Sequence, residues 1–345
     1  MDRESIEYDV VIVGGGPSGL ASACKLKQLN PSLSVCLLEK GSEIGSHILS
    51  GAVFEPKTLF ELFPEDAKDC PTLKTQVAKD DLFWLTGENK SIKVPSWLMP
   101  KSLHNKGNFI ISLGELCQWI SEKAMELGVD IFPGFPAQSY IKDASGRVIG
   151  IATGDMGIDK EGNQKGTYTP GMDILAKQTI FAEGARGHLG KQLIKEFNLD
   201  EGKTPQHFAI GFKEVWEVEN DMHSAGDVVH TMGWPLNEGT TGGGFLYHFD
   251  NKRIAVGLIV DLNYTNTSHS PFQEFQQFKK HPKIKQFLES GKRVSYGARA
   301  ITKGGINSLV KMDFNGGMII GCDAGTLNPS KIKGSHCALQ SGILA

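Results

Sequence analysis

The sequence predicts a mixed α/β (α+β) fold in which a Rossmann-like dinucleotide-binding domain carries an inserted antiparallel sheet. Three observations predict it. A buried apolar run near the N-terminus ends in a Gly-x-Gly-x-x-Gly turn at residues 14–19, and a second apolar run ends in Glu39. From residue 207 to residue 296 strand patterns follow one another with one intervening helix, and consecutive strands are typical of an antiparallel sheet.

The first turn joins a strand to a helix, and its glycines have separate roles. Gly14 allows the tight turn, Gly16 lets the backbone approach a pyrophosphate without a Cβ in the way, and Gly19 lets the helix pack closely on the strand. The unpaired N–H groups at the start of the helix, which runs to Leu29, then face the phosphates. This turn predicts a phosphate-binding site.

An acidic residue ends the next predicted strand, 35–38. Glu39 stands twenty residues after Gly19, where a carboxylate accepts hydrogen bonds from a ribose diol and repels a 2′-phosphate. Together the turn and the acid predict an adenine dinucleotide, either FAD or NAD. The connection over 40–52 starts beside the ribose position, and we expect it to form a wall of the cofactor site.

Two later segments, 182–187 and 321–325, repeat the pattern of a strand that ends in glycine and acid. An extended cofactor that spans a whole domain needs such repeated contacts, whereas NAD would not need a contact at 321–325. We therefore predict FAD. Asp323 is expected to hydrogen-bond the ribityl or pyrophosphate region, and the helix that starts near Lys333 is expected to point its N-terminus at the flavin ring.

The remaining elements follow from apolar periodicity and from the positions of glycine and proline. Helical spacing of apolar residues predicts a helix over 113–127, which Gly128 ends. The other predicted helices cover 56–63, a stretch that ends at Phe197, 272–278 and 333–345. The other predicted strands cover 82–85, 91–94, 129–132, 147–153, 166–182, 209–218, 228–234, 244–249, 253–260 and 317–320.

Composition places the chain among ordinary globular proteins. Its 345 residues are long for one core and allow two intertwined domains. A net charge of −3 and the lack of a basic stripe exclude a nucleic-acid binder. The six cysteines are scattered, without a C-x-x-C pair or a histidine at metal-ligand spacing, which predicts reduced thiols in a core and no metal site in this stretch.

No membrane-spanning segment is predicted, because no apolar run is long enough to cross a bilayer. The acidic stretch at 1–7 leads directly into the first strand, without a signal or transit peptide, so we expect an intracellular protein with at most peripheral membrane contact. The candidate contact is the loop that begins at Pro95 and ends at Leu103, in which a Trp-Leu-Met tip lies between prolines and beside lysines. The alternative is a loop folded onto its own domain.

Beyond these general features, eight strings of residues are specific. They are IGSHILSGA at 44–52, IFAEG at 180–184, GHL at 187–189, GWPL at 233–236, GGGFLYH at 242–248, SPFQEFQ at 270–276, YGARA at 296–300 and KIKGSH at 331–336. Together they resemble the family of electron-transfer flavoprotein:ubiquinone oxidoreductases, the electron-transferring-flavoprotein dehydrogenases. The resemblance extends from the first strand to the last residue.

The resemblance implies a flavoenzyme that lies peripherally on the inner or cytoplasmic membrane and faces the matrix or the cytoplasm. Such an enzyme takes electrons from reduced electron-transfer flavoprotein and passes them through FAD, and in the full-length family a [4Fe-4S] cluster, to ubiquinone. The implied domains are an FAD-binding domain of the glutathione-reductase/hydroxylase type at 1–80, 106–200 and 300–345, and a quinone-binding, membrane-facing domain at 81–105 and 201–299.

The resemblance carries over to individual residues. No side chain is assigned as a nucleophile or general acid, because the flavin carries the electrons. His47 and His248 are either proton donors to reduced quinone or hydrogen-bonded structural residues. The residues placed near the quinone head are Gly242, Gly243, Gly304 and Gly305. The residues placed around FAD are Gly14, Gly15, Gly16, Pro17, Ser18, Gly19, Glu39, Lys40, His47, Ser50, Gly51, Glu183, Gly184, Asp323 and Lys333.

One departure from the family concerns its [4Fe-4S] cluster, which four cysteines of a C-terminal region bind. Nothing after Cys337 supplies them, so the chain is either a fragment or a shortened relative, and its end inside a predicted helix favours a fragment. Two other functions stay open. One is a related FAD-dependent reductase or hydroxylase, of the geranylgeranyl-reductase type, that uses NAD(P)H. The other is a non-catalytic quinone- or membrane-binding module.

Overall fold

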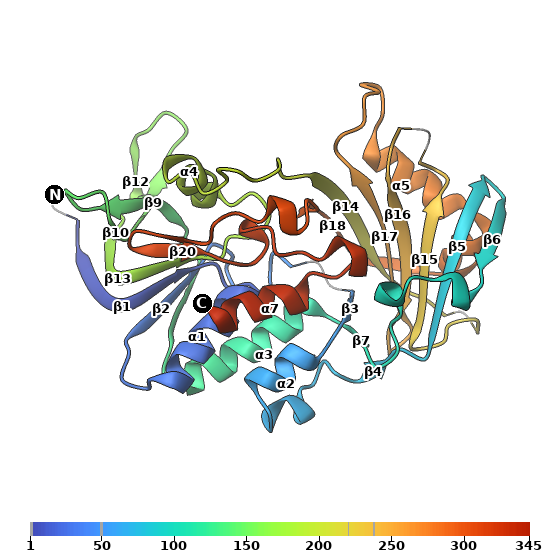
Figure 1. Cartoon of the computed structure of the whole chain (residues 1–345), viewed down its shortest axis with the longest axis horizontal. Coiled ribbons are helices and arrows are strands. Elements are labelled where there is room, and N and C mark those ends of the chain that lie inside the picture. The colour runs from blue at the N-terminus through green and yellow to red at the C-terminus, as the bar shows by residue number, and fades with distance from the viewer. Residues whose placement is uncertain (1–2, 49–50, 220, 237–238) are drawn as a thin grey trace.

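The chain folds into two sheet-based units that lie side by side (Figure 1). The computed structural model describes residues 3–48, 51–219, 221–236 and 239–345. An eight-stranded sheet forms the centre of the first unit, and a seven-stranded sheet forms the second. The first strand, β1 (Ser5–Val13), and the last helix, α7 (Ser335–Leu344), both belong to the first unit.

The first sheet has the parallel arrangement that the strand–turn–helix motif predicts. Its strand order is β19-β20-β13-β1-β2-β8, with β10 and β9 attached to β13, and the strands from β20 to β8 run parallel. The last four residues of β1 are buried, as expected at the centre of a sheet covered on both faces. The strands are β2 (Val35–Glu39), β8 (Asp130–Pro133), β9 (Ala137–Lys142), β10 (Val148–Thr153), β13 (Asp173–Phe181), β19 (Asp313–Phe314) and β20 (Gly317–Ile319).

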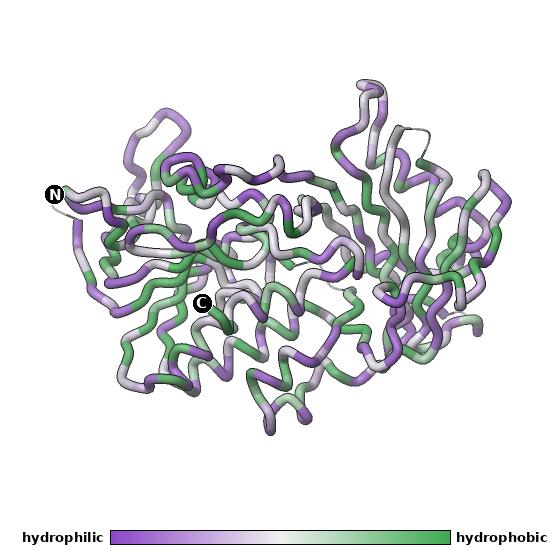
Figure 2. The backbone as a smooth tube through the Cα atoms, viewed as in Figure 1, coloured by the Kyte–Doolittle hydropathy of each residue, from purple (hydrophilic) through white to green (hydrophobic). Residues whose placement is uncertain are grey.

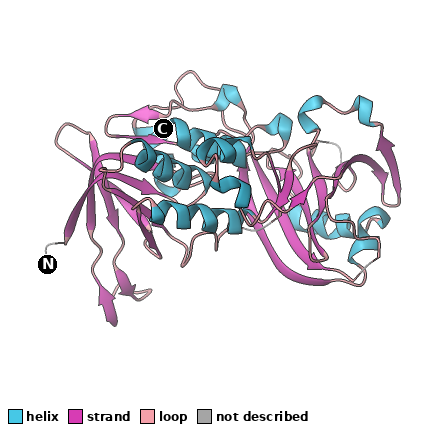
Figure 3. Ribbon diagram, turned by 90° about the horizontal axis from the view of Figure 1, so that it is seen from below, coloured by secondary structure: helices cyan, strands magenta, loops and turns pink. Residues whose placement is uncertain are grey.

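Helices cover one face of this sheet (Figure 3). The helix α1 (Pro17–Leu29) contacts α2 (Lys57–Leu62), α3 (Leu113–Glu126) and α7, and Leu20, Leu37 and Ile120 are fully buried in the core that they share with the sheet. The helix α7 can approach α1 closely because it carries Gly342. A Cβ there would lie 2.1 Å from the carbonyl oxygen of Ser18.

The strands β9 and β10 and the helix α4 (His188–Glu196) cover the opposite face. Val11 and Phe181 of the central strands pack there against Leu189 and Leu193 of α4. Burial on both faces explains why these strands are almost continuously apolar. Figure 2 shows the contrast with the outlying hairpin of β11 (Met156–Ile158) and β12 (Gln164–Thr169), which is largely hydrophilic.

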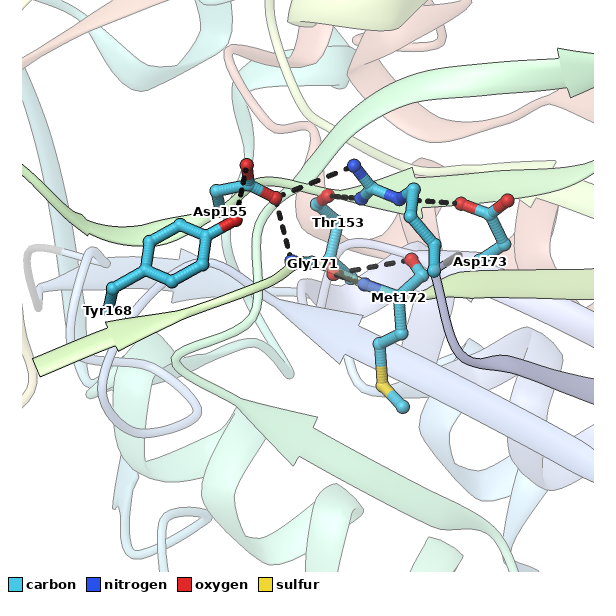
Figure 4. Close-up of polar contacts among 7 residues, drawn as sticks. Thr153, Asp155, Tyr168, Gly171, Met172 and Asp173 are labelled. Carbon is cyan, nitrogen blue, oxygen red and sulfur yellow. Dashed lines mark hydrogen bonds and ion pairs between the residues drawn. The ribbon is translucent and has the colours of Figure 1, made fainter. Parts of the chain in front are cut away.

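A cluster of polar contacts lies at the end of the sheet where β1 begins (Figure 4). The Nε of Arg3 donates to Asp173 at 3.0 Å, and a guanidinium nitrogen of Arg3 donates to the carbonyl of Thr153. Asp155 accepts a hydrogen bond from the backbone N–H of Gly171 at 2.8 Å. These contacts tie the start of the chain to the strands that flank the β11–β12 hairpin.

The second sheet has the order β18-β14-β17-β16-β15-β5-β6. The strands of the segment 208–302 all pair antiparallel, as predicted, and the hairpin β5–β6 adds one parallel pair, β15 with β5. The reason is topological, because an early hairpin of the chain joins the edge of a sheet built from a later segment. The strands are β5 (Lys79–Gly87), β6 (Lys90–Val94), β14 (Phe208–Glu217), β15 (Asp227–Gly233), β16 (Gly242–His248), β17 (Arg253–Asp261) and β18 (Lys292–Thr302).

The two faces of the second sheet have different partners. One face packs against α5 (Pro271–Lys280) and α6 (Pro282–Leu288), where Phe275 and Phe278 are buried. The other face packs against a small sheet of β3 (Ala52–Phe54), β4 (Thr75–Gln76) and β7 (Phe109–Ile111), and its core contains Val53, Phe245 and Tyr247. This second contact holds the two units together.

Several elements differ from the predictions. The strands β9 and β18 and the helix α6 were not predicted, and the predicted strand 166–182 divides into β12 and β13. Most side chains of β18 are exposed, so its sequence carries little apolar signal. The strand β13 pairs antiparallel with β10, and it also pairs in parallel with β1, which makes it a central strand of the sheet. Periodicity does not reveal the pairing partner of a strand.

Glu214 is a buried charge of the second sheet. Its carboxylate accepts hydrogen bonds from Lys279 Nζ at 2.9 Å and from Arg293 Nη1 at 3.1 Å. Because Glu214→Gln leaves Lys279 without its counter-charge, we expect a free energy of unfolding lower by about 3 kcal/mol in a denaturant titration. The matched control is Glu217→Gln, which removes a half-exposed pair with Arg253 and should cost less than about 1 kcal/mol. Equal losses in the two variants would contradict this prediction.

Candidate functional site

The carboxyl ends of four parallel strands meet at one edge of the first sheet. The strands β2, β1, β13 and β20 are neighbours in that order and point the same way, so the turns that follow them lie side by side. Those turns carry Glu39, the glycine-rich segment 14–19, Glu183 and Asp323. In open α/β sheets this edge is where ligands bind. The structure thus brings together the segments that end in glycine and acid.

Steric contacts explain the glycines of the turn after β1. Gly14 has a φ of +112°, and a Cβ there would lie 2.4 Å from the carbonyl oxygen of Ala182. A Cβ on Gly19 would lie 2.1 Å from the carbonyl oxygen of Gly14. In contrast, a Cβ on Gly16 would meet no described atom within 4 Å. Gly16 therefore borders open space, which fits a backbone that a pyrophosphate approaches.

The helix α1 begins at this open space. Gly16 is its N-cap residue and Pro17 occupies the first helical position, and no side chain in the described part of the chain caps its first turn. Ser18 is buried in that turn. The first N–H groups and the positive end of the helix dipole are thus available to an anion.

Glu39 is held beside the turn by backbone donors. Its Oε2 accepts a hydrogen bond from the N–H of Gly15 at 2.9 Å, and its Oε1 accepts one from Gly41 at 2.7 Å. Each oxygen keeps a lone pair for a further donor, so the carboxylate fits a ribose diol. His47 is half exposed, with its Nδ1 4.0 Å from Oε1, and Lys40 is exposed next to Glu39.

The predicted cofactor wall is in contact with the second unit. Gly51 has a φ of +98°, and its carbonyl accepts a hydrogen bond from Lys213 Nζ of β14 at 2.6 Å. Burial lowers the pKa of Lys213 to about 8. Ser50, which the prediction also placed at the cofactor, lies outside the described residues. A cation of the second sheet therefore reaches the wall that begins beside Glu39.

Glu183 has partners that the sequence pattern did not indicate. Its carboxylate accepts hydrogen bonds from the backbone N–H groups of His188 at 3.1 Å, Leu189 at 2.8 Å and Gly190 at 2.8 Å. It thereby caps the first turn of α4. Gly184 has a φ of +84° and borders open space. A contact of either residue with a cofactor stays a prediction.

Asp323 is buried with one oxygen unsatisfied. Its Oδ1 accepts a hydrogen bond from the N–H of Gly187 at 3.1 Å, and its Oδ2 has no hydrogen-bond partner in the described part of the chain. Burial, and then the neighbouring charge of Glu183, raise the pKa of Asp323 to about 8. A buried carboxylate oxygen without a partner is costly unless a ligand supplies a donor. Asp323 therefore fits a ligand with hydroxyl donors, such as the ribityl chain of FAD.

Lys333 lies just before α7. Its side chain is buried, and its Nζ donates to the carbonyl of Lys331 at 2.9 Å. Burial lowers the pKa of Lys333. The N-cap residue of α7 is Gly334, which makes no side-chain cap. That this helix points at a flavin ring stays a prediction.

The four glycines predicted near a quinone gather at one end of the second sheet. Gly242 and Gly243 begin β16, and Gly304 and Gly305 follow β18. Asp261, at the end of β17, accepts hydrogen bonds from the side chains of the residues that precede each pair. A Cβ on Gly242 would lie 2.0 Å from a carbonyl oxygen of β17, and one on Gly304 would lie 2.3 Å from a serine oxygen. Packing alone therefore requires glycine at both positions.

The buried histidine that faces the first unit is His230, which the sequence analysis missed. Its Nε2 lies 2.9 Å from Tyr247 Oη and its Nδ1 lies 3.9 Å from Asp80 Oδ1, and burial lowers its pKa to about 4. His248 lies on the opposite face of β16, with its ring 4.9 Å from that of Phe287 in α6. No local pattern could have found His230, because the register of three strands assembles this group.

The loop between Pro95 and Leu103 forms two short 3₁₀ turns, η2 (Ser96–Leu98) and η3 (Lys101–Leu103). Trp97 is 80% exposed and Leu98 is 56% exposed, whereas Met99 is 6% exposed. The exposed tip is therefore Trp-Leu, and the prediction that Met99 belongs to it is wrong. Among the described residues, no helix combines the length and the apolar character that crossing a membrane requires.

The cysteines are free thiols. Four are buried and two, Cys322 and Cys337, are half-buried. Within the ranges that the structure describes, no three His, Cys, Asp or Glu side chains gather as metal ligands.

Comparison with curated proteins shows a similarity that extends over the whole chain. Over its full length the chain is 58% identical to the electron transfer flavoprotein-ubiquinone oxidoreductase of Pseudomonas aeruginosa and 53% identical to the probable enzyme of that name from Acinetobacter baylyi. The human mitochondrial protein of that name is 47% identical over the full chain. Along its full length the chain is therefore similar to the electron transfer flavoprotein-ubiquinone oxidoreductases. It spans 64%, 61% and 57% of the lengths of these three relatives.

Two family models match parts of the chain. A model described as "NAD(P)-binding Rossmann-like domain" matches 12–64, which contains the glycine turn and Glu39. A model described as "ETF-QO, ubiquinone-binding" matches 208–301. That segment contains Gly242 and Gly243 and ends before Gly304. The match to the ubiquinone-binding model therefore covers the pair Gly242 and Gly243 and does not cover the pair Gly304 and Gly305.

Solved structures share the fold at low sequence identity. A geranylgeranyl bacteriochlorophyll reductase-like protein from Thermoplasma acidophilum matches with a TM-score of 0.72 and 18% identity, covering 98% of this chain and 77% of that one. A flavin-dependent brominase matches with a TM-score of 0.66 and 16% identity, with coverage of 98% and 77%. These matches confirm the predicted fold class. At such identities the matches show that this chain shares an architecture with these proteins, and they do not show a shared reaction.

Proposed function

We propose that this protein is an FAD-dependent oxidoreductase that passes electrons from reduced electron-transfer flavoprotein to ubiquinone. The observation that carries the proposal is the 58% identity, over the whole chain, to a bacterial protein named for that reaction. The cradle at the edge of the first sheet supports it, because a glycine turn, a ribose-binding acid and an unsatisfied buried carboxylate lie along one line of strands.

FAD fits the residues of this cradle. The turn at 14–19 would hold the pyrophosphate, Glu39 the ribose and Asp323 the ribityl hydroxyls. When bound, FAD supplies a carrier that exchanges electrons both with a one-electron donor and with a quinone. The chain's own residues bind and orient it, and Lys213 places a positive charge behind the wall at Gly51, where it stabilises nearby negative charge.

Ubiquinone is proposed to bind where the second sheet meets the first unit. Gly242 and Gly243 are the proposed contacts because they lie in the segment matched to a ubiquinone-binding model, and Gly304 and Gly305 lie at the same end of the sheet. The apolar core around Phe245 keeps water out of the junction between the units. Exclusion of water protects the electrons from side reactions.

Peripheral attachment to the inner or cytoplasmic membrane is part of the proposal. Trp97 and Leu98 are the proposed anchor, because an exposed aromatic and an exposed aliphatic residue share one short loop. Electron-transfer flavoprotein is the proposed protein partner, by the same family match. The [4Fe-4S] cluster of the full-length family is expected on residues other than those described here.

The test identifies the cofactor first and the electron acceptor second. The purified protein is denatured, and chromatography is expected to find FAD at about one per chain. A soluble ubiquinol analogue is then added to the oxidised holoprotein, and we expect it to bleach the flavin absorbance, because quinone reduction is reversible. NADPH is expected to leave the absorbance unchanged.

Three outcomes would contradict the proposal. Rapid bleaching by NADPH would favour the geranylgeranyl-reductase-like alternative. A colourless protein with an intact fold would favour a non-catalytic binding module. If FAD is present but reduced electron-transfer flavoprotein does not bleach it, the proposed donor is wrong while the cofactor assignment stands.

A further inference from the structure

A basic pocket of about 460 Å³ lies between α2, the loop after β6 and the segment before α7. Its cations come from separate stretches of the chain, and one described carboxylate, Glu55, also lines it. The cationic and titratable side chains are those of Lys57, Lys101, His104, Lys106, Lys331 and Lys333. The fold therefore collects charges around one cavity that are dispersed in the sequence.

The positive charge of this pocket is not balanced. Five lysines face one glutamate, whose Oε2 already accepts a hydrogen bond from Lys331 Nζ at 2.7 Å. Lys57, Lys101 and Lys106 form an ion pair with none of the described carboxylates. Collecting ammonium groups without counter-ions costs free energy, and a bound anion would offset that cost. The pocket is therefore suited to an anion.

The pocket is next to the exposed apolar tip of the membrane-contact loop. Lys101 follows Leu98 by three residues, and Phe60, which is also exposed, lines the pocket from α2. An aromatic and aliphatic anchor beside a cationic site is the arrangement by which peripheral proteins hold anionic lipids. Both halves of that arrangement occur here within one stretch of the surface.

We propose that this pocket binds the phosphodiester headgroup of an anionic phospholipid. Lysine ammonium groups recognise phosphate oxygens as mobile point charges, which suits a headgroup that moves in a fluid interface. The inference rests on the membrane contact of Trp97 and Leu98 proposed above. A soluble phosphate compound offers the same chemistry, so the experiment separates the two sources.

The experiment measures vesicle binding of the purified holoenzyme by flotation. Vesicles contain phosphatidylcholine alone or with about one fifth phosphatidylglycerol. Wild type is compared with a pocket variant and with a control variant that loses the same charge at the far side of the first unit, on β12 and α4 and their turns (Figure 1). The pocket variant combines Lys57→Gln, Lys101→Gln and Lys106→Gln, and the control combines Lys160→Gln, Lys165→Gln and Lys195→Gln.

We expect the pocket variant to lose roughly 100-fold in partitioning to anionic vesicles while the control variant loses much less, since each lysine near the surface contributes about 1 kcal/mol. Flavin content should be unchanged in both. Equal losses in the two variants, or equal binding of wild type to neutral and anionic vesicles, would overturn the proposal. A third outcome would also overturn it. Inorganic phosphate would raise the melting temperature of wild type but not that of the pocket variant, and the two proteins would bind vesicles equally well.

Two further results distinguish lipid binding by the pocket from protein docking at the pocket and from membrane anchoring by Trp97. If the pocket variant binds vesicles normally but loses affinity for electron-transfer flavoprotein, the pocket is a protein-docking site and the lipid assignment is wrong. The variant Trp97→Ser tests the anchor itself, and we expect it to weaken binding to neutral vesicles. Unchanged binding of Trp97→Ser to neutral vesicles would refute the anchor, whereas a wild type that binds neutral and anionic vesicles equally would refute only the pocket.

Discussion

Replacing Gly16 by valine should abolish flavin binding while the protein stays folded. The backbone at Gly16 is extended, with φ −83° and ψ −178°, and no described atom lies within 4 Å of a Cβ built there. The cofactor-free protein should therefore lose less than about 1 kcal/mol of stability, the order of a changed helix N-cap. The valine would fill the space through which a pyrophosphate reaches α1, and we expect affinity for FAD to fall at least about 100-fold.

The matched variant is Gly14→Ala, which changes the same turn in the opposite way. Its φ of +112° is unfavourable for alanine, and the new Cβ would lie 2.4 Å from the carbonyl oxygen of Ala182. Stability of the cofactor-free protein should therefore fall by roughly 3 kcal/mol. Denaturant titration of both cofactor-free variants and fluorescence titration with FAD separate the two effects.

Two results for Gly16→Val would contradict this pair of predictions. If Gly16→Val purifies with a full complement of FAD, the pyrophosphate does not pass Gly16, and the cofactor assignment of the turn is wrong. If Gly16→Val unfolds as readily as Gly14→Ala, the open space beside Gly16 is a packing requirement and carries no information about a ligand.

The cofactor-free protein should lose stability as the pH rises, because of Asp323. Its pKa rises from 3.8 in the unfolded chain to about 8 in the fold, through burial and then the charge of Glu183. Between these values the folded protein holds a proton that the unfolded chain has released, so raising the pH favours unfolding. The contribution of Asp323 to the free energy of unfolding is fully present below pH 4 and is lost as the pH rises through about 8. Between pH 5 and pH 8 the free energy of unfolding should fall by on the order of 4 kcal/mol.

The measurement is the free energy of unfolding of the cofactor-free protein at pH 5 and pH 8. Asp323→Asn cannot ionise, so its stability should change much less over this interval, and it should bind FAD more weakly because it lacks the carboxylate oxygen that a ribityl hydroxyl would meet. The exposed Asp200, changed to asparagine, is the control and should keep the slope of wild type. A wild-type slope in Asp323→Asn would show that other groups cause the pH dependence.

Much of the geometry of the candidate cofactor site could be predicted because it depends on local sterics. Gly14 and Gly19 must be glycine since any Cβ would strike a backbone oxygen, and such constraints appear in the sequence as spacing. Glu39 stands at the end of its strand, a fixed distance from the turn. The alternation of buried strand and amphipathic helix likewise indicated the first unit, because burial on one or two faces sets the apolar period.

What the sequence by itself determined is therefore local: the glycine turn, its helix, the acid that ends β2 and the resemblance that the specific strings carry. The tertiary structure decided which distant segments meet. It placed β5 parallel to β15, turned Glu183 toward the first turn of α4, paired His230 with Tyr247 and gathered the lysines of the basic pocket. The physical reason is that spacing along the chain encodes dihedral angles and faces, whereas contacts across sheets depend on register and on chain topology, which no window of sequence contains.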